Sequence, residues 1–247
     1  VLHAGAVGSD GLFLKEILAD AGADVSCLRT MDTESGCAFI EVNSKGQNRI
    51  IVSAGTNRMY TEEYIQSVLE KAEAGDFVLL QNEINMVGEI IRLSHEKGCR
   101  VVFNASPIPK NPEELPLELV DIFMVNELEA AALAGTSAEG DFRDILKALQ
   151  KKYPKAAIVM TLGKDGVLYG YKEEFYSHPI FKVNAVDTTA AGDTFCGYFL
   201  AALCAGKSVE MALREASAAS AMAVSAKGAA PSIPVHSAME EWLRGRS

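Results

Sequence analysis

Short apolar runs alternate with amphipathic stretches along most of this chain, which is the pattern of an α/β protein. After residue 60 the expected helices and strands follow one another regularly. They cover Thr61–Ala72 (helix), Phe77–Gln81 (strand), Met86–Lys97 (helix), Arg100–Asn104 (strand), Asp121–Val125 (strand) and Ala156–Thr161 (strand). Such alternation predicts a three-layer fold: a mostly parallel central sheet with helices on both faces.

The two ends of the chain extend this pattern. Val1–Val7 is an apolar, strand-like segment without a starting methionine, and Gly8–Gly11 leads from it into an amphipathic helix over Leu12–Ala21. Near the other end, Val209–Ala226 is an alanine-rich helix whose small side chains allow close packing against another helix. His236–Arg246 is expected to be a closing amphipathic helix.

Two short alternating segments, Ser35–Val42 and Asn48–Ser53, interrupt the βα pattern. The residues between them, Asn43–Gln47, have the turn chemistry of a β-hairpin. We therefore expect one main α/β domain made of residues 1–33 and 55–247, with residues 34–54 forming a small β-hairpin.

The hairpin should carry apolar side chains on one face, at Ala38, Ile40 and Val42. Such a face would be covered by a two-fold partner in a homodimer, which is a hypothesis at this point. The alternative is a surface hairpin that only protects a sheet edge.

Composition limits the classes of partner. The chain has 247 residues, 49% of them hydrophobic, and 33 acidic against 23 basic residues give a net charge of −10. One α/β domain can bury a substantial core at this length. The negative charge argues against a general nucleic-acid or anionic-membrane surface, so the expected partners are small molecules.

The thiols and imidazoles are scattered. The cysteines are Cys27, Cys37, Cys99, Cys196 and Cys204, and the histidines are His3, His95, His178 and His236. An odd number of cysteines without a C-x-x-C pair favours reduced thiols in a cytoplasmic protein, and the histidine spacing shows no local metal motif. The longest apolar run, around Cys196–Ala205, is about half of the ~20 residues that cross a bilayer.

The stretch Val186–Phe195 carries the chemistry. Its small residues lead into an apolar run that is expected to be a buried helix starting at or near Ala191. A helix start offers unpaired N–H groups and the positive end of the macrodipole, and Ala190, Ala191 and Gly192 let an anion come close. Asp193 puts a carboxylate beside this anion hole, where it could remove a proton, so the pattern suggests phosphoryl transfer. The alternative is that Asp193 only caps the helix.

The motif "DTTAAGDTF" at residues 187–195, followed by "KGAAPSIP" at 227–234, closely resembles the ribokinase family of carbohydrate kinases. The resemblance covers nearly the whole chain and implies a ribokinase-like fold with a β lid over the sugar. It implies that ATP, with Mg²⁺, phosphorylates a primary hydroxyl of a small sugar, ribose being the expected one. Asp193 would be the base, and Ala190, Ala191 and Gly192 the anion hole.

One departure concerns the front of the chain. The family's first strand and a glycine-rich sugar-binding segment would lie ahead of the part that resembles residues 6–25, and we expect them to be missing. The alternatives are therefore another sugar or nucleoside kinase of the family, or a nucleotide-binding remnant without a competent sugar site.

The resemblance also implies nucleotide and magnesium contacts. Asn126 and Glu129 would organise the phosphates and the magnesium-water shell, although the same pair could be only a capping box. Further ATP contacts would come from Thr161, Gly163, Gly166, Gly192 and Ser217. An ordinary turn explains the two loop glycines equally well, and packing explains Ser217. The loop is no Walker A motif, and the absence of an early G-x-G-x-x-G argues against a dinucleotide oxidoreductase.

Two further groups of residues follow from the resemblance. Glu83, Asp187 and Asp193 are expected at the sugar, with a solvated loop acid as the alternative for Glu83. A potassium-like ion would be held by Asp187, Thr189, Ala223, Ala226, Gly228 and Ser232. From the residues alone, the non-helical segment Gly228–Ser232 has carbonyls that need a partner, and water in the same space is the alternative.

Overall fold

The structure is a computed structural model that describes residues 1–42 and 48–246. The chain divides into two compact units, each described by itself. Unit 1 consists of Val1–Val102 with Pro109–Val120, and unit 2 of Phe103–Ile108 with Asp121–Ser247.

The largest sheet has the strand order β10-β9-β8-β7-β6-β5. Its strands are β5 (Phe77–Gln81), β6 (Arg100–Asn104), β7 (Ile122–Asn126), β8 (Ala157–Thr161), β9 (Val167–Tyr171) and β10 (Glu174–His178). β7 and β8 run parallel, whereas β9 is antiparallel to both β8 and β10. The predicted α/β architecture is confirmed, and the strands expected from apolar runs lie within one residue of their expected bounds.

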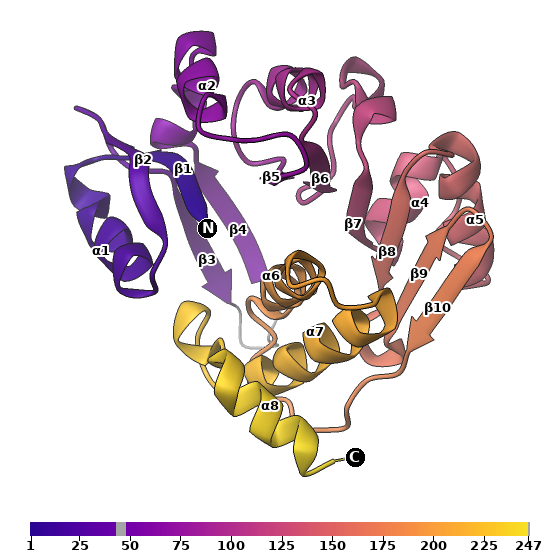
Figure 1. The fold of residues 1–247 in the computed structure, drawn as a ribbon. Helices are drawn as coiled ribbons and strands as arrows, with labels where there is room; N and C mark the ends of the chain where they lie inside the picture. Colours follow the sequence, from indigo (N-terminus) through magenta and orange to yellow (C-terminus); the bar gives the residue numbers. More distant parts are fainter. Residues whose placement is uncertain (43–47, 247) are drawn as a thin grey trace. The chain divides into compact units, whose positions relative to one another are not determined.

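In unit 2, helices cover both faces of the strands. They are α4 (Glu127–Ala134), α5 (Phe142–Lys152), α6 (Ala191–Cys204), α7 (Val209–Val224) and α8 (His236–Arg244). Figure 1 shows α4 and α5 on one side of β7–β10 and α6 and α7 on the other. The short 3₁₀ helices of this unit are η5 (Gly163–Asp165) and η6 (Ala230–Ser232).

The core of unit 2 explains this arrangement. Phe103, Phe123 and Ile158 are completely buried on adjacent strands, as is expected for a sheet covered on both faces. The alanines of α7 are largely buried, and the Ser220 hydroxyl donates to the Ala191 carbonyl at 3.1 Å. The small residues of α7 therefore bring it close to the start of α6, as the sequence predicts.

Unit 1 begins with a separate parallel pair, β1 (Leu2–Val7) and β2 (Asp24–Thr30). Its helices are η1 (Ser9–Gly11), α1 (Leu12–Asp20), η2 (Gly55–Arg58), α2 (Glu62–Leu69), α3 (Val87–Glu96), η3 (Pro112–Glu114) and η4 (Leu117–Leu119). The Tyr64 hydroxyl of α2 lies 2.6 Å from the Cys27 carbonyl and 3.1 Å from the Gly5 carbonyl, so it ties the helix to both strands.

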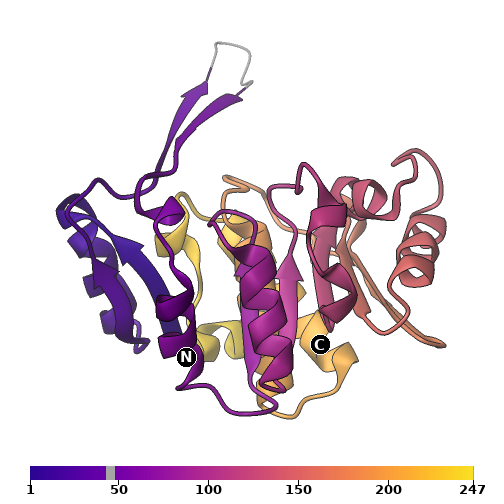
Figure 2. The same ribbon diagram turned by 90° about the horizontal axis from the view of Figure 1, so that it is seen from above.

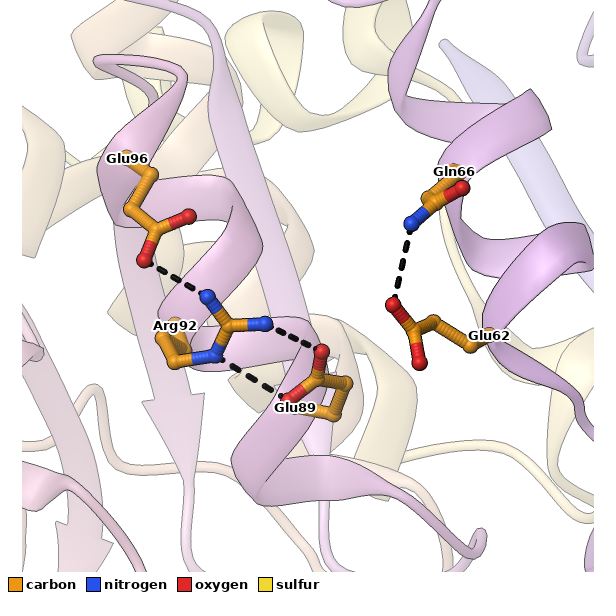
Figure 3. A network of polar contacts seen from close by, with 5 residues as sticks. All are labelled: Glu62, Gln66, Glu89, Arg92 and Glu96. Carbon is orange, nitrogen blue, oxygen red and sulfur yellow. Dashed lines mark hydrogen bonds and ion pairs between the residues drawn. The ribbon is translucent and has the colours of Figure 1, made fainter.

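The exposed faces of α2 and α3 carry polar side-chain pairs (Figure 3). Arg92 forms ion pairs with Glu89, one turn before it, and with Glu96, one turn after it, at 2.6 Å from the latter. On α2 the Gln66 amide donates to Glu62 at 3.0 Å. Pairs at this spacing stabilise an exposed helix by about 0.2–0.5 kcal/mol each, so they support the helices without defining a site.

The predicted lid is an antiparallel pair, β3 (Cys37–Val42) and β4 (Asn48–Ser53), that forms a sheet of its own. Figure 2 shows it extending away from β1 and β2. The predicted turn residues 43–47 lie outside the described residues, as do the side chains of Ile40 and Val42. On the described part, Ala38 is exposed and Phe39 is 61% exposed, which leaves apolar surface on the hairpin.

Within the described ranges, no helix has both the length and the apolar character that a bilayer-spanning segment needs.

Candidate active site

The start of α6 is open, as the sequence predicts. Ala190 is the N-cap residue, has a left-handed backbone with φ of 57°, and makes no side-chain cap bond. The Thr194 N–H group makes an i to i−4 bond to the Ala190 carbonyl at 2.9 Å, so the amides of Ala191, Gly192 and Asp193 precede this first helical bond. The Ala191 N–H already donates to the Thr188 carbonyl, at a long 3.3 Å. Such amides and the helix dipole attract an anion.

The space beside Gly192 is open. A β-carbon built on Gly192 would meet no atom within 4 Å, and Gly192 and Asp193 are both exposed. Asp193 lies in the first turn of α6, where its negative charge also suits the positive end of the helix dipole, so the capping alternative stays open. An exposed carboxylate therefore stands in the first turn of a helix whose N-cap residue makes no side-chain cap bond.

Asp187 fastens the segment before α6 to the segment after α7. One carboxylate oxygen accepts from the Thr189 N–H at 3.0 Å and from the Thr189 hydroxyl at 2.6 Å. The other accepts from the Gly228 N–H at 3.0 Å. The hydrogen bonds from the Thr189 side chain, the Gly228 backbone and the Thr189 backbone lower the pKa of Asp187 to about 2. The carboxylate is thus charged at neutral pH.

The segment after α7 differs in part from expectation. The sequence predicts Gly228–Ser232 to be non-helical, but Ala230–Ser232 forms a 3₁₀ turn, which Pro231 favours by its fixed φ. The turn supplies partners for some carbonyls: the Ser232 N–H and hydroxyl both donate to Ala229, at 3.0 and 2.8 Å. Similarly, the Ala223 carbonyl accepts from the Ala226 N–H at 3.1 Å.

Asn126 and Glu129 form a complete capping box at the start of α4. The Asn126 side chain accepts from the Glu129 N–H at 2.8 Å, and Glu129 Oε2 accepts from the Asn126 N–H at 2.9 Å. Glu129 is buried, and this burial raises the pKa of its carboxyl group although Asn126 and Ser106 donate hydrogen bonds to it. The capping interpretation is confirmed, and the box also fixes one buried carboxyl group beside the strand ends.

The last residues of β7 and β8 lie opposite each other, since Asn126 pairs with Thr161 in the sheet register. The loop after Thr161 contains two glycines with positive φ, 53° at Gly163 and 95° at Gly166. A β-carbon on Gly166 would come within 2.3 Å of the His178 carbonyl, so packing is by itself a sufficient reason for a glycine here. A β-carbon on Gly163 would meet nothing within 4 Å, which leaves room for a ligand beside the loop.

Unit 2 therefore contains most of the predicted site residues. Glu83 belongs to unit 1, where it is exposed in the turn after β5. Ser217 is half-buried on α7. Sequence reasoning missed Ser220, the residue whose hydroxyl holds the first turn of α6. The signal was available, because Ser220 follows Ser217 by three residues on the alanine-rich helix and so points in nearly the same direction.

In the part of the chain that the structure describes, no three His, Cys, Asp or Glu side chains gather closely enough to hold a metal ion by themselves.

The chain is similar to known carbohydrate kinases. The profile of the pfkB family carbohydrate kinases matches residues 1–236. The ribokinase of Haemophilus influenzae is 34% identical over 244 residues, which cover 96% of this chain and 79% of that protein. A solved structure of Arabidopsis thaliana ribokinase with ribose and ATP has a TM-score of 0.85 at 30% identity, covering 98% of this chain and 81% of that one. The ribokinase of Cryptococcus neoformans with ADP also has a TM-score of 0.85, at 29% identity, covering 98% of this chain and 82% of that one.

Proposed function

Because the chain belongs to the pfkB family of carbohydrate kinases, we propose that it transfers the γ-phosphoryl group of ATP to the primary hydroxyl group of ribose. The product is ribose 5-phosphate. The similar Arabidopsis thaliana ribokinase was solved with both of these ligands, which supports the choice of donor and acceptor.

The observation that carries this proposal is the start of α6, whose N-cap residue makes no side-chain cap bond, with open space at Gly192 and an exposed carboxylate at Asp193. Asp193 accepts the proton of the sugar hydroxyl while the hydroxyl oxygen bonds to the γ-phosphorus. The bond from the γ-phosphorus to the bridging oxygen breaks, and ADP leaves with that oxygen. The amides of Ala191, Gly192 and Asp193, with Ala190 shaping the turn before them, stabilise the charge on the phosphoryl oxygens.

Magnesium supports this reaction when it is bound, because it neutralises charge on the β- and γ-phosphates. Asn126 and Glu129 would hold its water shell. Their fit rests on the buried Glu129 carboxyl group, whose raised pKa reflects a poorly solvated negative charge that a nearby cation would stabilise. The remaining ATP contacts are assigned to Thr161, Gly163, Gly166, Gly192 and Ser217.

A monovalent cation, K⁺, would lie beside the anion hole. Asp187 supplies a permanent negative charge and joins the two carbonyl-rich segments, so the donor set fits a weakly hydrated cation. The other proposed ligands are the carbonyls of Thr189, Ala223, Ala226 and Gly228, and Ser232.

The sugar would contact Glu83, Asp187 and Asp193, with the β3–β4 lid over it. The exposed Phe39 and Ile51, which are paired across the hairpin, support a homodimer through the lid, and light scattering showing a monomer at micromolar concentration would count against it. The five free thiols agree with a reducing, cytoplasmic location.

The test is a coupled ADP-release assay over a panel of pentoses, hexoses and nucleosides, with ribose expected to be the best acceptor. Asp193→Asn should lower kcat by ~10²–10⁴ while ADP affinity is kept, because the variant lacks only the base. Repeating the assay without Mg²⁺, and with tetramethylammonium replacing K⁺, tests the cation assignments. Unchanged turnover in Asp193→Asn refutes the mechanism, and ADP binding without turnover of any acceptor identifies a nucleotide-binding protein instead.

A further inference from the structure

The carboxyl end of β6 brings a third polar side chain into the row already formed by β7 and β8. β6 neighbours β7 in the sheet, and Asn104 is its last residue, as Asn126 and Thr161 are the last residues of the next two strands. In open α/β sheets, ligands bind beyond the carboxyl ends of the strands. Asn104 belongs to unit 2, with the rest of this row.

One end of the Asn104 amide is held and the other is not. Its Nδ2 donates to the Cys196 sulfur of α6 at 3.2 Å. Its Oδ1 is buried and has no hydrogen-bond partner among the described residues. Buried polar atoms without a partner are uncommon because they destabilise the folded state, so this oxygen needs an explanation.

The surroundings of Cys196 indicate which ligand the oxygen would accept. Burial raises the pKa of the Cys196 thiol to about 12. The Asn104 hydrogen bond is the next largest influence and lowers this pKa, while the negative charges of Asp193 and Glu129 raise it by less. The thiol therefore stays protonated and serves as an anchor for the amide. The amide is bonded to a thiol on which two negative carboxylates act. An acceptor oxygen in such surroundings disfavours an approaching phosphate oxygen and favours a hydrated cation, whose waters donate hydrogen bonds.

We propose that Asn104 is a positioning residue whose Oδ1 accepts a hydrogen bond from the water shell of the magnesium ion that accompanies the nucleotide. Asn104 then acts together with Asn126 and Glu129, and Cys196 fixes the direction of its amide. This inference rests on the proposed function, because the magnesium ion arrives with ATP or ADP.

The test is calorimetric titration of the full chain with ADP, with and without Mg²⁺, so that the readout is binding and not turnover. Removing an outer-shell partner of a metal commonly lowers affinity by ~10–100-fold. Asn104→Leu should reduce the Mg²⁺-dependent gain in ADP affinity by about tenfold or more and leave the affinity for metal-free ADP unchanged. Asn104→Asp keeps the acceptor and should retain the gain.

Two variants complete the design. Ser94→Ala removes another buried polar atom without a partner, in α3 of unit 1, and should leave the Mg²⁺-dependent gain unchanged. Cys196→Val releases the amide while keeping a similar volume, and should lower the gain by less than Asn104→Leu does. Thermal unfolding of each variant shows whether it is folded. If Asn104→Leu does not fold, the Mg²⁺-dependent gains of Cys196→Val and Asn104→Asp test the role of Asn104.

The outcomes separate the two proposals. A native chain that does not bind ADP overturns the proposed function and this role together. If Mg²⁺ increases the ADP affinity of the native chain and of Asn104→Leu equally, only the role of Asn104 is overturned. Loss of the gain in Asn104→Asp, with weaker binding of metal-free ADP, would mean that the amide donates to a phosphate and also contradicts the proposal.

Discussion

Gly192→Ala should make the protein more stable and nearly inactive at the same time. Gly192 lies in the first turn of α6, and its β-carbon would meet no protein atom within 4 Å. Its φ is not positive, so alanine can adopt the same backbone. In the proposed mechanism, however, the open space at this position belongs to the γ-phosphoryl group.

The two effects have different sizes and opposite signs. Glycine in a helix is less stable than alanine by about 0.5–1 kcal/mol, and less near an end. For a domain of 150–250 residues, 1 kcal/mol corresponds to a Tm change of about 2–4 °C, so the variant should melt about 1–4 °C higher. A methyl group that moves the phosphoryl oxygens away from one amide donor should lower kcat by ~10²–10³, equivalent to about 2.7–4 kcal/mol.

The measurements are Tm by thermal unfolding and kcat by coupled ADP release. Gly245→Ala is the matched control: it is the same exchange at the end of α8, where φ is −76° and the nearest atom to a new β-carbon is 3.8 Å away. This control should keep the native kcat. Native kcat in Gly192→Ala would refute the anion hole, and a lower Tm would show that the space is not free in the folded chain.

Three further predictions concern residues around this helix start. Burial raises the pKa of Glu129, so the folded chain loses stability as pH rises through that pKa and the carboxyl group ionises. Glu129→Gln should therefore melt no lower than the native chain at pH 7. Its ADP affinity, measured by calorimetry, should respond less to Mg²⁺. Because the pKa of Asp187 is lowered, its carboxylate stabilises the folded chain fully above the ordinary pKa near 3.8, and this stabilisation is lost as pH falls towards about 2. Asp187→Asn should therefore have a lower Tm than the native chain at pH 6, and the difference should shrink near pH 2. Ser220→Ala removes the hydrogen bond to Ala191, about 1 kcal/mol, and should lower Tm by about 2–4 °C, whereas an unchanged Tm would show that the bond does not hold α6.

Local sequence signals were sufficient for much of the fold and the centre of the site. Apolar runs located the buried strands because a strand covered on both faces has almost no polar residues. The Asn126 and Glu129 spacing predicted a capping box, since that motif depends on residues only three apart. The start of α6 was found because small residues precede a long apolar run.

Features that depend on contacts distant in sequence could not be predicted in this way. The glycine requirement at Gly166 comes from the carbonyl of His178 on a neighbouring strand. β2 and β10 are rich in polar and exposed residues, so their pairing with a neighbouring strand, and not their hydropathy, defines them. Asn104 was expected only as the last residue of a strand, because the hydrogen bond that holds its amide goes to Cys196, 92 positions later in the sequence.

Three features of unit 2 each destabilise the folded protein in the absence of a ligand. Ala190 has a left-handed backbone, which costs a residue other than glycine on the order of 1 kcal/mol. Asn104 keeps a buried oxygen without a partner, and Glu129 keeps a carboxyl group whose ionised form is poorly solvated. The cost of each would be offset by a different part of one ligand: the amides that follow Ala190 would bind the phosphoryl group, and the two oxygen-bearing side chains would bind the hydrated cation. That one magnesium nucleotide would satisfy all three is the physical reason for assigning the nucleotide to this end of the sheet.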